Sequence, residues 1–164
     1  MDLPAIKEAW SKDSVIDQVM LDEASLRIPQ LHQKYLGWRQ EFSLLAKRKR
    51  QELKKLQHAK TLYYSGKARP EEYEKEPFNY KLMKSDVPAW VAVDESVNKV
   101  EMQLEYYNEI LDSLDEILKQ INQMSFNIKN AVQWRMFVGG GTGLLAALPS
   151  IMASSSVLGC MSIS

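Results

Sequence analysis

The sequence predicts an all-α protein built on a long helical hairpin. Glycine and proline are scarce, with seven and six residues in a chain of 164, and four of the glycines cluster near its end. Most of the chain therefore lacks helix breakers. In two long segments, 21–64 and 94–138, apolar residues recur at alternating spacings of three and four, which places them on one face of a helix.

The N-terminal residues 2–20 are predicted to form a short helix followed by a loose connection. Leu3, Ile6 and Trp10 recur at helical spacing, and Asp2 precedes them as a suitable N-cap.

The segment 21–64 is expected to be one long helix. Pro29 either kinks this helix or is the first residue of its straight part. Ser65 and Gly66 then provide a C-cap, with the glycine in the left-handed conformation. Residues 1–66 are grouped as an N-terminal unit of helices that carries the basic segment described below.

Residues 67–93 are predicted to connect the two long helices. Pro70, Pro77 and Pro88 interrupt this connector, and connections of such length are often functional or mobile. Whether part of it forms a short helix or a strand is left open by its sequence.

The segment 94–138 is predicted to be a coiled-coil-like oligomerisation helix. Its candidate assembly residues are Val97, Val100, Leu104, Tyr107, Leu111, Leu114, Leu118, Ile121 and Ile128. A second apolar row consists of Ile110, Ile117, Met124 and Ala131. Two rows are wider than a two-stranded coiled coil requires. We therefore expect this helix to pack against its own chain and also against another copy, in a homo-oligomer whose subunit number the pattern leaves open.

Residues 136–164 carry no charged side chain, and this length is sufficient to span a bilayer. Five glycines, a proline and many hydroxyl side chains make the segment only weakly apolar. We expect 139–164 to be a flexible tail. A coiled-coil adaptor anchored to a membrane by this tail is the alternative hypothesis.

Nothing in the sequence indicates catalysis, a metal site or a cofactor. His32 and His58 lie on the same predicted helix, roughly 39 Å apart if it is straight, so they cannot share a metal within one chain. Cys160 is the only cysteine, and no phosphate-binding loop is present. An enzyme is therefore not expected. The N-terminus lacks a basic segment followed by an apolar core, so a cytoplasmic location is expected.

A formal net charge of zero conceals a strong segregation of charge. Residues 47–84 hold twelve basic and five acidic groups, whereas 85–135 hold four basic and nine acidic groups. The candidate phosphate contacts are Lys47, Arg48, Lys49, Arg50, Lys54, Lys55, Lys60, Lys67 and Arg69, with Tyr63 and Tyr64 as stacking candidates. Cations neutralise phosphates and aromatic rings stack on unpaired bases, so this combination favours single-stranded nucleic acid. A solvated helix face with packed tyrosines, an anionic membrane surface and a protein-docking patch are the alternatives.

Three elements, in register along residues 10–138, resemble the UvsY family of phage recombination mediators. The first is 62–84, which begins Leu-Tyr-Tyr-Ser-Gly-Lys, the second is 97–107, and the third is 126–137. The resemblance implies a ring-shaped homo-oligomer, expected to be a heptamer, in the cytoplasm of the host cell if the chain is phage-encoded. It implies no nucleotide hydrolysis.

The resemblance also implies partners and a DNA contact. The family binds single-stranded DNA and loads a RecA-like recombinase onto DNA covered by a single-strand-binding protein. Its basic pair just before the Tyr-Tyr-Ser-Gly element falls here on His58 and Lys60. His58 departs from the usual lysine and is only partly charged near neutral pH.

Overall fold

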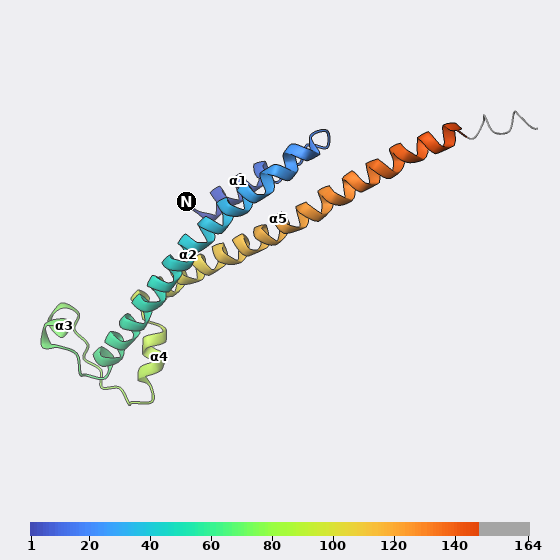
Figure 1. The fold of residues 1–164 in the computed structure, drawn as a ribbon. Coiled ribbons are helices and arrows are strands. Elements are labelled where there is room, and N and C mark those ends of the chain that lie inside the picture. Colours follow the sequence, from blue (N-terminus) through green and yellow to red (C-terminus); the bar gives the residue numbers. More distant parts are fainter. Residues whose placement is uncertain (148–164) are drawn as a thin grey trace, which may run out of the picture.

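Residues 1–147, the part of the chain that the structure describes, form five α-helices and no strand in the computed structural model (Figure 1). The helices are α1 (Leu3–Asp13), α2 (Leu21–Tyr64), α3 (Pro70–Lys75), α4 (Val87–Ala92) and α5 (Glu95–Ala147). The two long helices α2 and α5 run side by side in opposite directions, and α1 lies along them. Helices α3 and α4 lie at the end of the hairpin where α2 stops. The predicted all-α class and helical hairpin are confirmed.

Local capping explains where α1 begins and where α2 ends. Asp2 Oδ1 accepts a hydrogen bond from the amide of Ala5 at 3.2 Å, which confirms the predicted N-cap of α1. Helix α2 ends where Gly66 adopts a φ of 72°, and the amide of Lys67 donates to a carbonyl of the last turn at 2.9 Å. Glycine takes this left-handed conformation without a clash at Cβ. Pro29 lies inside α2, so the helix begins before it.

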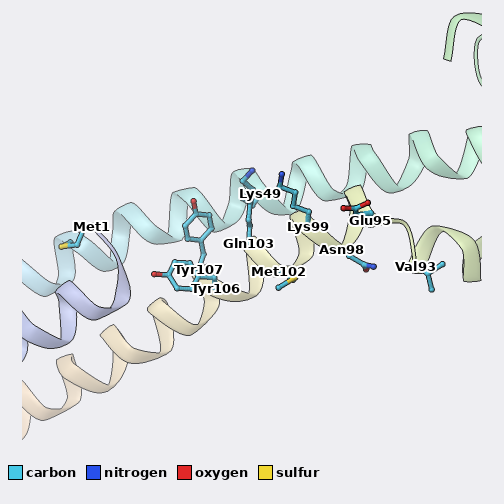
Figure 2. A pocket seen from close by; sticks show the side chains of 10 residues that line it. All are labelled: Met1, Lys49, Val93, Glu95, Asn98, Lys99, Met102, Gln103, Tyr106 and Tyr107. Carbon is cyan, nitrogen blue, oxygen red and sulfur yellow. The ribbon is translucent and has the colours of Figure 1, made fainter. Parts of the chain in front are cut away.

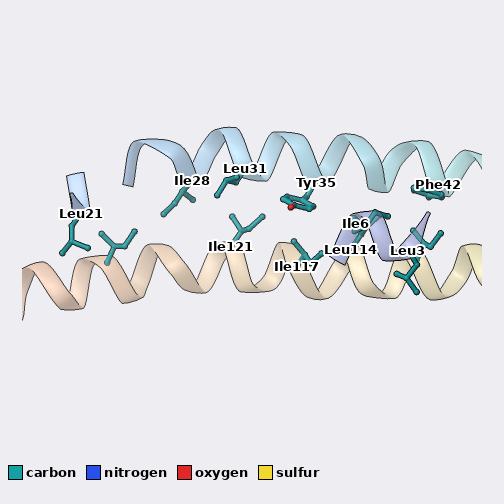
Figure 3. Close-up of a cluster of buried hydrophobic side chains, with 12 residues drawn as sticks. Leu3, Ile6, Leu21, Ile28, Leu31, Tyr35, Phe42, Leu114, Ile117 and Ile121 are labelled. Carbon is teal, nitrogen blue, oxygen red and sulfur yellow. The ribbon is translucent and has the colours of Figure 1, made fainter. Parts of the chain in front are cut away.

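The main core lies where α1, α2 and α5 meet (Figure 3). Its buried side chains are Leu3, Ile6, Leu21, Ile28, Leu31, Tyr35, Phe42, Ile110, Leu114, Ile117, Ile121 and Ile128. Figure 3 shows Ile121 of α5 directed towards Ile28 and Leu31 of α2. Burial of these apolar surfaces is the main favourable term that holds the helices together.

Helix α1 explains why the apolar face of α5 is so wide. The amide of Leu3 donates to the Tyr106 hydroxyl at 3.0 Å, and the Trp10 indole donates to the side chain of Gln120 at 3.0 Å. These two hydrogen bonds hold α1 against α5, next to α2. Two helices of the same chain therefore cover α5, and the second apolar row needs no other copy to bury it.

The structure divides the nine candidate assembly residues into two groups. Five are buried inside the chain, namely Val97, Val100, Leu114, Ile121 and Ile128. Four are only partly buried, namely Leu104, Tyr107, Leu111 and Leu118. The helices of the same chain therefore cover the first group, and the assembly role expected for the row stays a prediction. Only the second group keeps surface for a contact between copies.

A second, smaller core closes the turn of the hairpin. It consists of Leu53 from α2, Val87 and Val91 from α4, and Val97 and Val100 from α5. Helix α4 thus packs on both arms, and the segment predicted as a connector contains two short helices. The question left open by its sequence is answered in favour of helix.

Helix α5 continues beyond its predicted end at Val138 and reaches Ala147. Each glycine between 139 and 143 lowers helix propensity by about 1 kcal/mol, but it keeps its amide donor. The remainder of the predicted tail, 148–164, lies outside the described residues. Within 1–147, none of the helices combines the length and the apolar content needed to cross a membrane.

We predict that Leu114→Ala lowers the free energy of unfolding by about 2–5 kcal/mol, because Leu114 is fully buried in the main core. Leu26→Ala is the matched control, since Leu26 is exposed on α2, and it should change stability by less than about 0.5 kcal/mol. Urea unfolding followed by circular dichroism at one fixed protein concentration measures both. Equal losses in the two variants would contradict the assigned core.

Candidate nucleic-acid interface

Six basic side chains form one exposed face of α2, which we call the cationic face. They are Lys47, Arg48, Arg50, Lys54, Lys55 and His58. Ala46 and Leu53, on the opposite side of the helix, are buried against the rest of the chain. Because α2 packs through that side, the helical repeat turns these basic groups towards solvent. The face extends roughly 17 Å along the helix axis at 1.5 Å per residue.

Two predicted phosphate contacts, Lys49 and Lys60, are already engaged within the chain. Lys49 Nζ lies 2.8 Å from a carboxylate oxygen of Glu52. Lys60 Nζ lies 3.0 Å from Asp94 Oδ2 and 3.4 Å from Glu76 Oε2, and its side chain is largely buried. Lys60 is therefore paired with two carboxylates within the chain, and the phosphate contact expected for it stays a prediction. Lys49 contributes less positive charge than its place in the sequence suggested.

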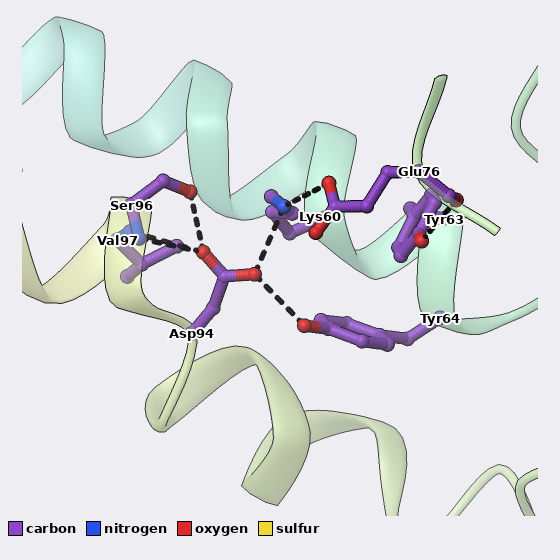
Figure 4. Close-up of polar contacts among 7 residues, drawn as sticks. All are labelled: Lys60, Tyr63, Tyr64, Glu76, Asp94, Ser96 and Val97. Carbon is purple, nitrogen blue, oxygen red and sulfur yellow. Dashed lines mark hydrogen bonds and ion pairs between the residues drawn. The ribbon is translucent and has the colours of Figure 1, made fainter. Parts of the chain in front are cut away.

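Asp94 joins the end of α2 to the start of α5 (Figure 4). Its Oδ1 accepts hydrogen bonds from the amides of Ser96 and Val97 at 3.0 and 3.2 Å, which makes Asp94 the N-terminal cap of α5. The Ser96 hydroxyl donates to the same oxygen. Its Oδ2 accepts from the Tyr64 hydroxyl at 2.8 Å and pairs with Lys60. One buried carboxylate thus fixes two helices of the hairpin relative to each other.

The pKa of Asp94 lies well below its ordinary value. Burial of the carboxyl group opposes ionisation, but hydrogen bonds from Ser96, Lys60, Tyr64 and the Val97 amide outweigh that effect. The pKa of Lys60 is raised. Burial disfavours its charge, and the contacts with Asp94 and Glu76 more than compensate. Both groups are therefore charged at neutral pH, as a buried ion pair must be to remain stable.

Tyr63 and Tyr64 are packed inside this end of the hairpin. Tyr63 is 5% exposed, its ring stacks on that of Tyr73 at 5.1 Å, and its hydroxyl donates to the Glu76 carbonyl at 2.6 Å. Tyr64 is held by its bond to Asp94. Tyr63 is buried and Tyr64 is partly buried, so both rings are engaged within the chain, and their predicted stacking role stays a prediction. Their contacts instead attach the connector to α2.

Two exposed aromatic side chains in the connector were not recognised from the sequence. Tyr80 is 71% exposed and Trp90, on α4, is 39% exposed. Phe78 lies between them and the packed tyrosines, with its ring centroid 5.7 Å from that of Tyr80 and 5.6 Å from that of Trp90. The sequence signal was the presence of these three aromatic residues close to Lys81 and Lys84, which are exposed. Because the aromatic residues follow no periodic spacing, the sequence did not indicate that they meet in space.

The turn that follows α2 carries the remaining predicted phosphate contacts. Lys67 directly follows the C-cap glycine, and Arg69 directly precedes α3. Both are exposed. They lie at the end of the hairpin that also holds α4, beyond the C-terminal end of the cationic face.

An open groove of about 1120 Å³ runs along the start of α5 (Figure 2). Lys49 of α2 and Lys99 of α5 line it, together with Met102 and Tyr106. The groove is wide and open to solvent, unlike the enclosed, mostly apolar pockets that hold small substrates. Over the described part of the chain, no group of three or more histidine, cysteine or acidic side chains is placed to hold a metal ion.

These features define a class: helical hairpin proteins that present a cationic helix face rather than a chemically reactive pocket. The sequence model of the family "Recombination, repair and ssDNA binding protein UvsY" matches residues 9–141. The chain belongs to the UvsY family, whose members are recombination mediators.

Comparison with individual proteins agrees with this assignment. The chain is 26% identical over 140 residues to the recombination protein uvsY of Enterobacteria phage T4, covering 85% of this chain and 99% of that protein. The crystal structure of the bacteriophage T4 recombination mediator protein UvsY in lattice type II matches with a TM-score of 0.76 at 26% identity, over 85% of this chain and 98% of that one. Lattice type IV gives a TM-score of 0.72 at 25% identity, over 84% and 98%.

We predict that Asp94→Asn lowers the free energy of unfolding at pH 7 by about 3 kcal/mol, because it leaves Lys60 buried without its closest counter-charge. The folded-state pKa of Asp94 is depressed, so its contribution is complete above the unfolded value near 4 and is lost as the pH falls below it. The difference between wild type and variant should therefore shrink in acid.

Denaturant unfolding at a series of pH values from 7 to 2 measures this dependence. Asp112→Asn is the matched control, since Asp112 is an exposed carboxylate on the same helix. A constant difference between wild type and Asp94→Asn across the whole pH series would contradict the assigned role of Asp94.

Proposed function

We propose that this protein is a recombination mediator that binds single-stranded DNA through the cationic face of α2. In this proposal it helps to load a RecA-like recombinase in place of a single-strand-binding protein. The observation that carries the proposal is the cationic face itself, exposed on a helix whose other side is packed. Family membership over residues 9–141 supports it independently.

The proposed contact is with phosphates rather than with base edges. Lysine and arginine side chains on one helix face neutralise successive phosphates and release counterions, which gives affinity without sequence preference. Lys67 and Arg69 are exposed in the turn that follows α2 and add further positive charge there. The protein would hold the strand in a shape that favours the recombinase, and it would need no catalytic residue to do so.

Self-association is the second part of the proposal. Trp134 and Phe137, near the C-terminal end of α5, are 66% and 72% exposed, and their ring centroids lie 5.9 Å apart. Phe126 is exposed on the same helix. Large apolar surfaces of this kind mark association sites on soluble proteins. With the partly buried Leu111 and Leu118, they form the surface through which we propose a ring-like homo-oligomer, expected to be a heptamer.

Assembly would multiply a modest affinity. Each subunit contributes one cationic face, and after the first contact the others bind at a high effective concentration. Seven of the nine acidic residues of 85–135 lie on the other long helix, so most of the negative charge of this segment lies on the arm that does not carry the cationic face. We place this activity in the cytoplasm, where the proposed partners would meet the strand.

We predict that Lys54→Ala combined with Lys55→Ala weakens binding to a single-stranded oligonucleotide and reduces the slope of log affinity against log salt by about 1.4, since roughly 0.7 is lost for each phosphate contact. Fluorescence anisotropy with a labelled oligonucleotide at several salt concentrations measures both. Lys7→Ala combined with Lys129→Ala is the matched control, because it removes two exposed lysines elsewhere. An unchanged slope in the first variant would move the site away from the cationic face.

We also predict that Trp134→Ala combined with Phe137→Ala lowers the molar mass of the assembly measured by sedimentation equilibrium, because the exposed apolar end of α5 is removed. Affinity for single-stranded DNA should fall with it, through the loss of multivalent binding. Met83→Ala, at an exposed position of the connector, is the control. An unaltered molar mass would show that the copies associate through another surface.

A further inference from the structure

The connector presents an aromatic surface that the packing of the chain does not require. Tyr80 keeps 71% of its surface in solvent, so most of its ring remains uncovered. Trp90 is half as exposed, and its ring centroid lies 6.3 Å from that of Tyr80 at an interplanar angle of 31°. Aromatic rings of this size normally bury most of their area in a core or an interface.

We propose that Tyr80 and Trp90 form a stacking platform for the unpaired bases of a single strand whose phosphates lie on the cationic face. This proposal rests on the proposed function and adds a base contact to it. Stacking on aromatic side chains is tolerant of sequence, because every base has a flat face, and it commonly accompanies a positively charged backbone track.

The platform is held firmly in place by the packed end of the hairpin. Phe78 contacts both rings, and its own ring meets that of Tyr64 edge-on at 5.2 Å. Tyr64 is in turn hydrogen-bonded to the buried carboxylate of Asp94. Rings fixed in this way lose little conformational freedom when a base stacks on them, which lowers the cost of binding.

Lysine side chains lie near both rings. Lys81 and Lys84 are exposed in the connector close to Tyr80 in the sequence, and Lys99 lines the same hollow as Trp90. Three carboxylates also line this hollow, of which those of Asp94 and Glu76 are paired with Lys60 and that of Glu95 is not in that pair. The cationic face ends at His58, about 9 Å along the helix axis from Tyr64. Trp90 belongs to α4, which packs on Leu53 at the side of α2 opposite the cationic face. In this proposal the strand therefore passes around the end of α2 to reach the rings.

The test compares two oligonucleotides of equal length, oligo(dT) and an abasic strand, which share the phosphate backbone but differ in having bases. The full chain binds each one in fluorescence-anisotropy titrations over a range of salt concentrations. We expect wild type to prefer oligo(dT). Tyr80→Leu combined with Trp90→Leu should bind oligo(dT) about 10-fold more weakly or worse, with affinity for the abasic strand and the salt slope unchanged.

A conservative variant distinguishes stacking on an aromatic ring from the particular shape of the Tyr80 and Trp90 side chains. Tyr80→Phe combined with Trp90→Phe retains two aromatic rings and should keep the preference for oligo(dT). Circular dichroism checks that both variants are folded.

Three results would overturn the platform. In the first, wild type binds the strands but the leucine variant keeps the full preference for oligo(dT). In the second, the leucine variant loses the same affinity for both strands. That result is expected if the substitutions disturb the connector in general, or if the rings bind a protein partner instead of bases. In the third, the phenylalanine variant fails like the leucine variant. If wild type binds neither strand, the proposed function itself fails, which is a different outcome.

Discussion

The burial of the inner face of α5 is the constraint on which the rest of the molecule depends. An isolated helix of this length with fully buried isoleucines and leucines on one side is not stable in water without partners. Helix α2 covers that face up to about Ile128, and α1 covers a part that α2 leaves open. Arg39 of α2 and Asp115 of α5 add a bidentate ion pair across the same contact.

That packing determines where the positive charge is exposed. Since α2 packs on α5 through the side that contains Ala46 and Leu53, basic residues on the other side face solvent. Glu52, the one acidic residue within the run, is paired with Lys49. The exposed side therefore presents cations with little local opposition. The hydrophobic contact between the arms thus orients the charge on which the proposed function depends.

The two long helices were predictable from the sequence, because they follow from local chemistry, whereas α3, α4 and the last turns of α5 were not. The caps at Asp2 and Gly66 and the extent of α2 needed only the preferences of individual residues. The role of α1 was not predictable. A wide apolar stripe indicates that two neighbouring helices cover a helix. It does not indicate whether the second of these helices belongs to the same chain or to another copy. The sequence predicts contacts with the same chain and with another copy, and the buried Ile6 shows that α1 of the same chain covers part of the stripe.

Prediction from the sequence meets the same limit at the candidate site. A basic run identifies cations, but it cannot tell which of them find a carboxylate far away in the sequence. Lys60 and Asp94 are separated by 34 positions and meet only because the hairpin closes. The exposed aromatic rings of the connector also converge only in three dimensions. Periodicity describes one helix at a time, whereas ion pairs and aromatic clusters between elements depend on the tertiary contacts.

The two proposed surfaces lie far apart, and this separation bears on how the protein could work. From Glu95 to Trp134, α5 extends roughly 58 Å at 1.5 Å per residue. The cationic face and the aromatic rings lie towards the closed end of the hairpin, and the exposed apolar side chains lie towards the other end. Copies that associate through the far end of α5 would leave every cationic face uncovered. Assembly and strand binding then use different side chains. Each added subunit therefore adds DNA contacts without removing any.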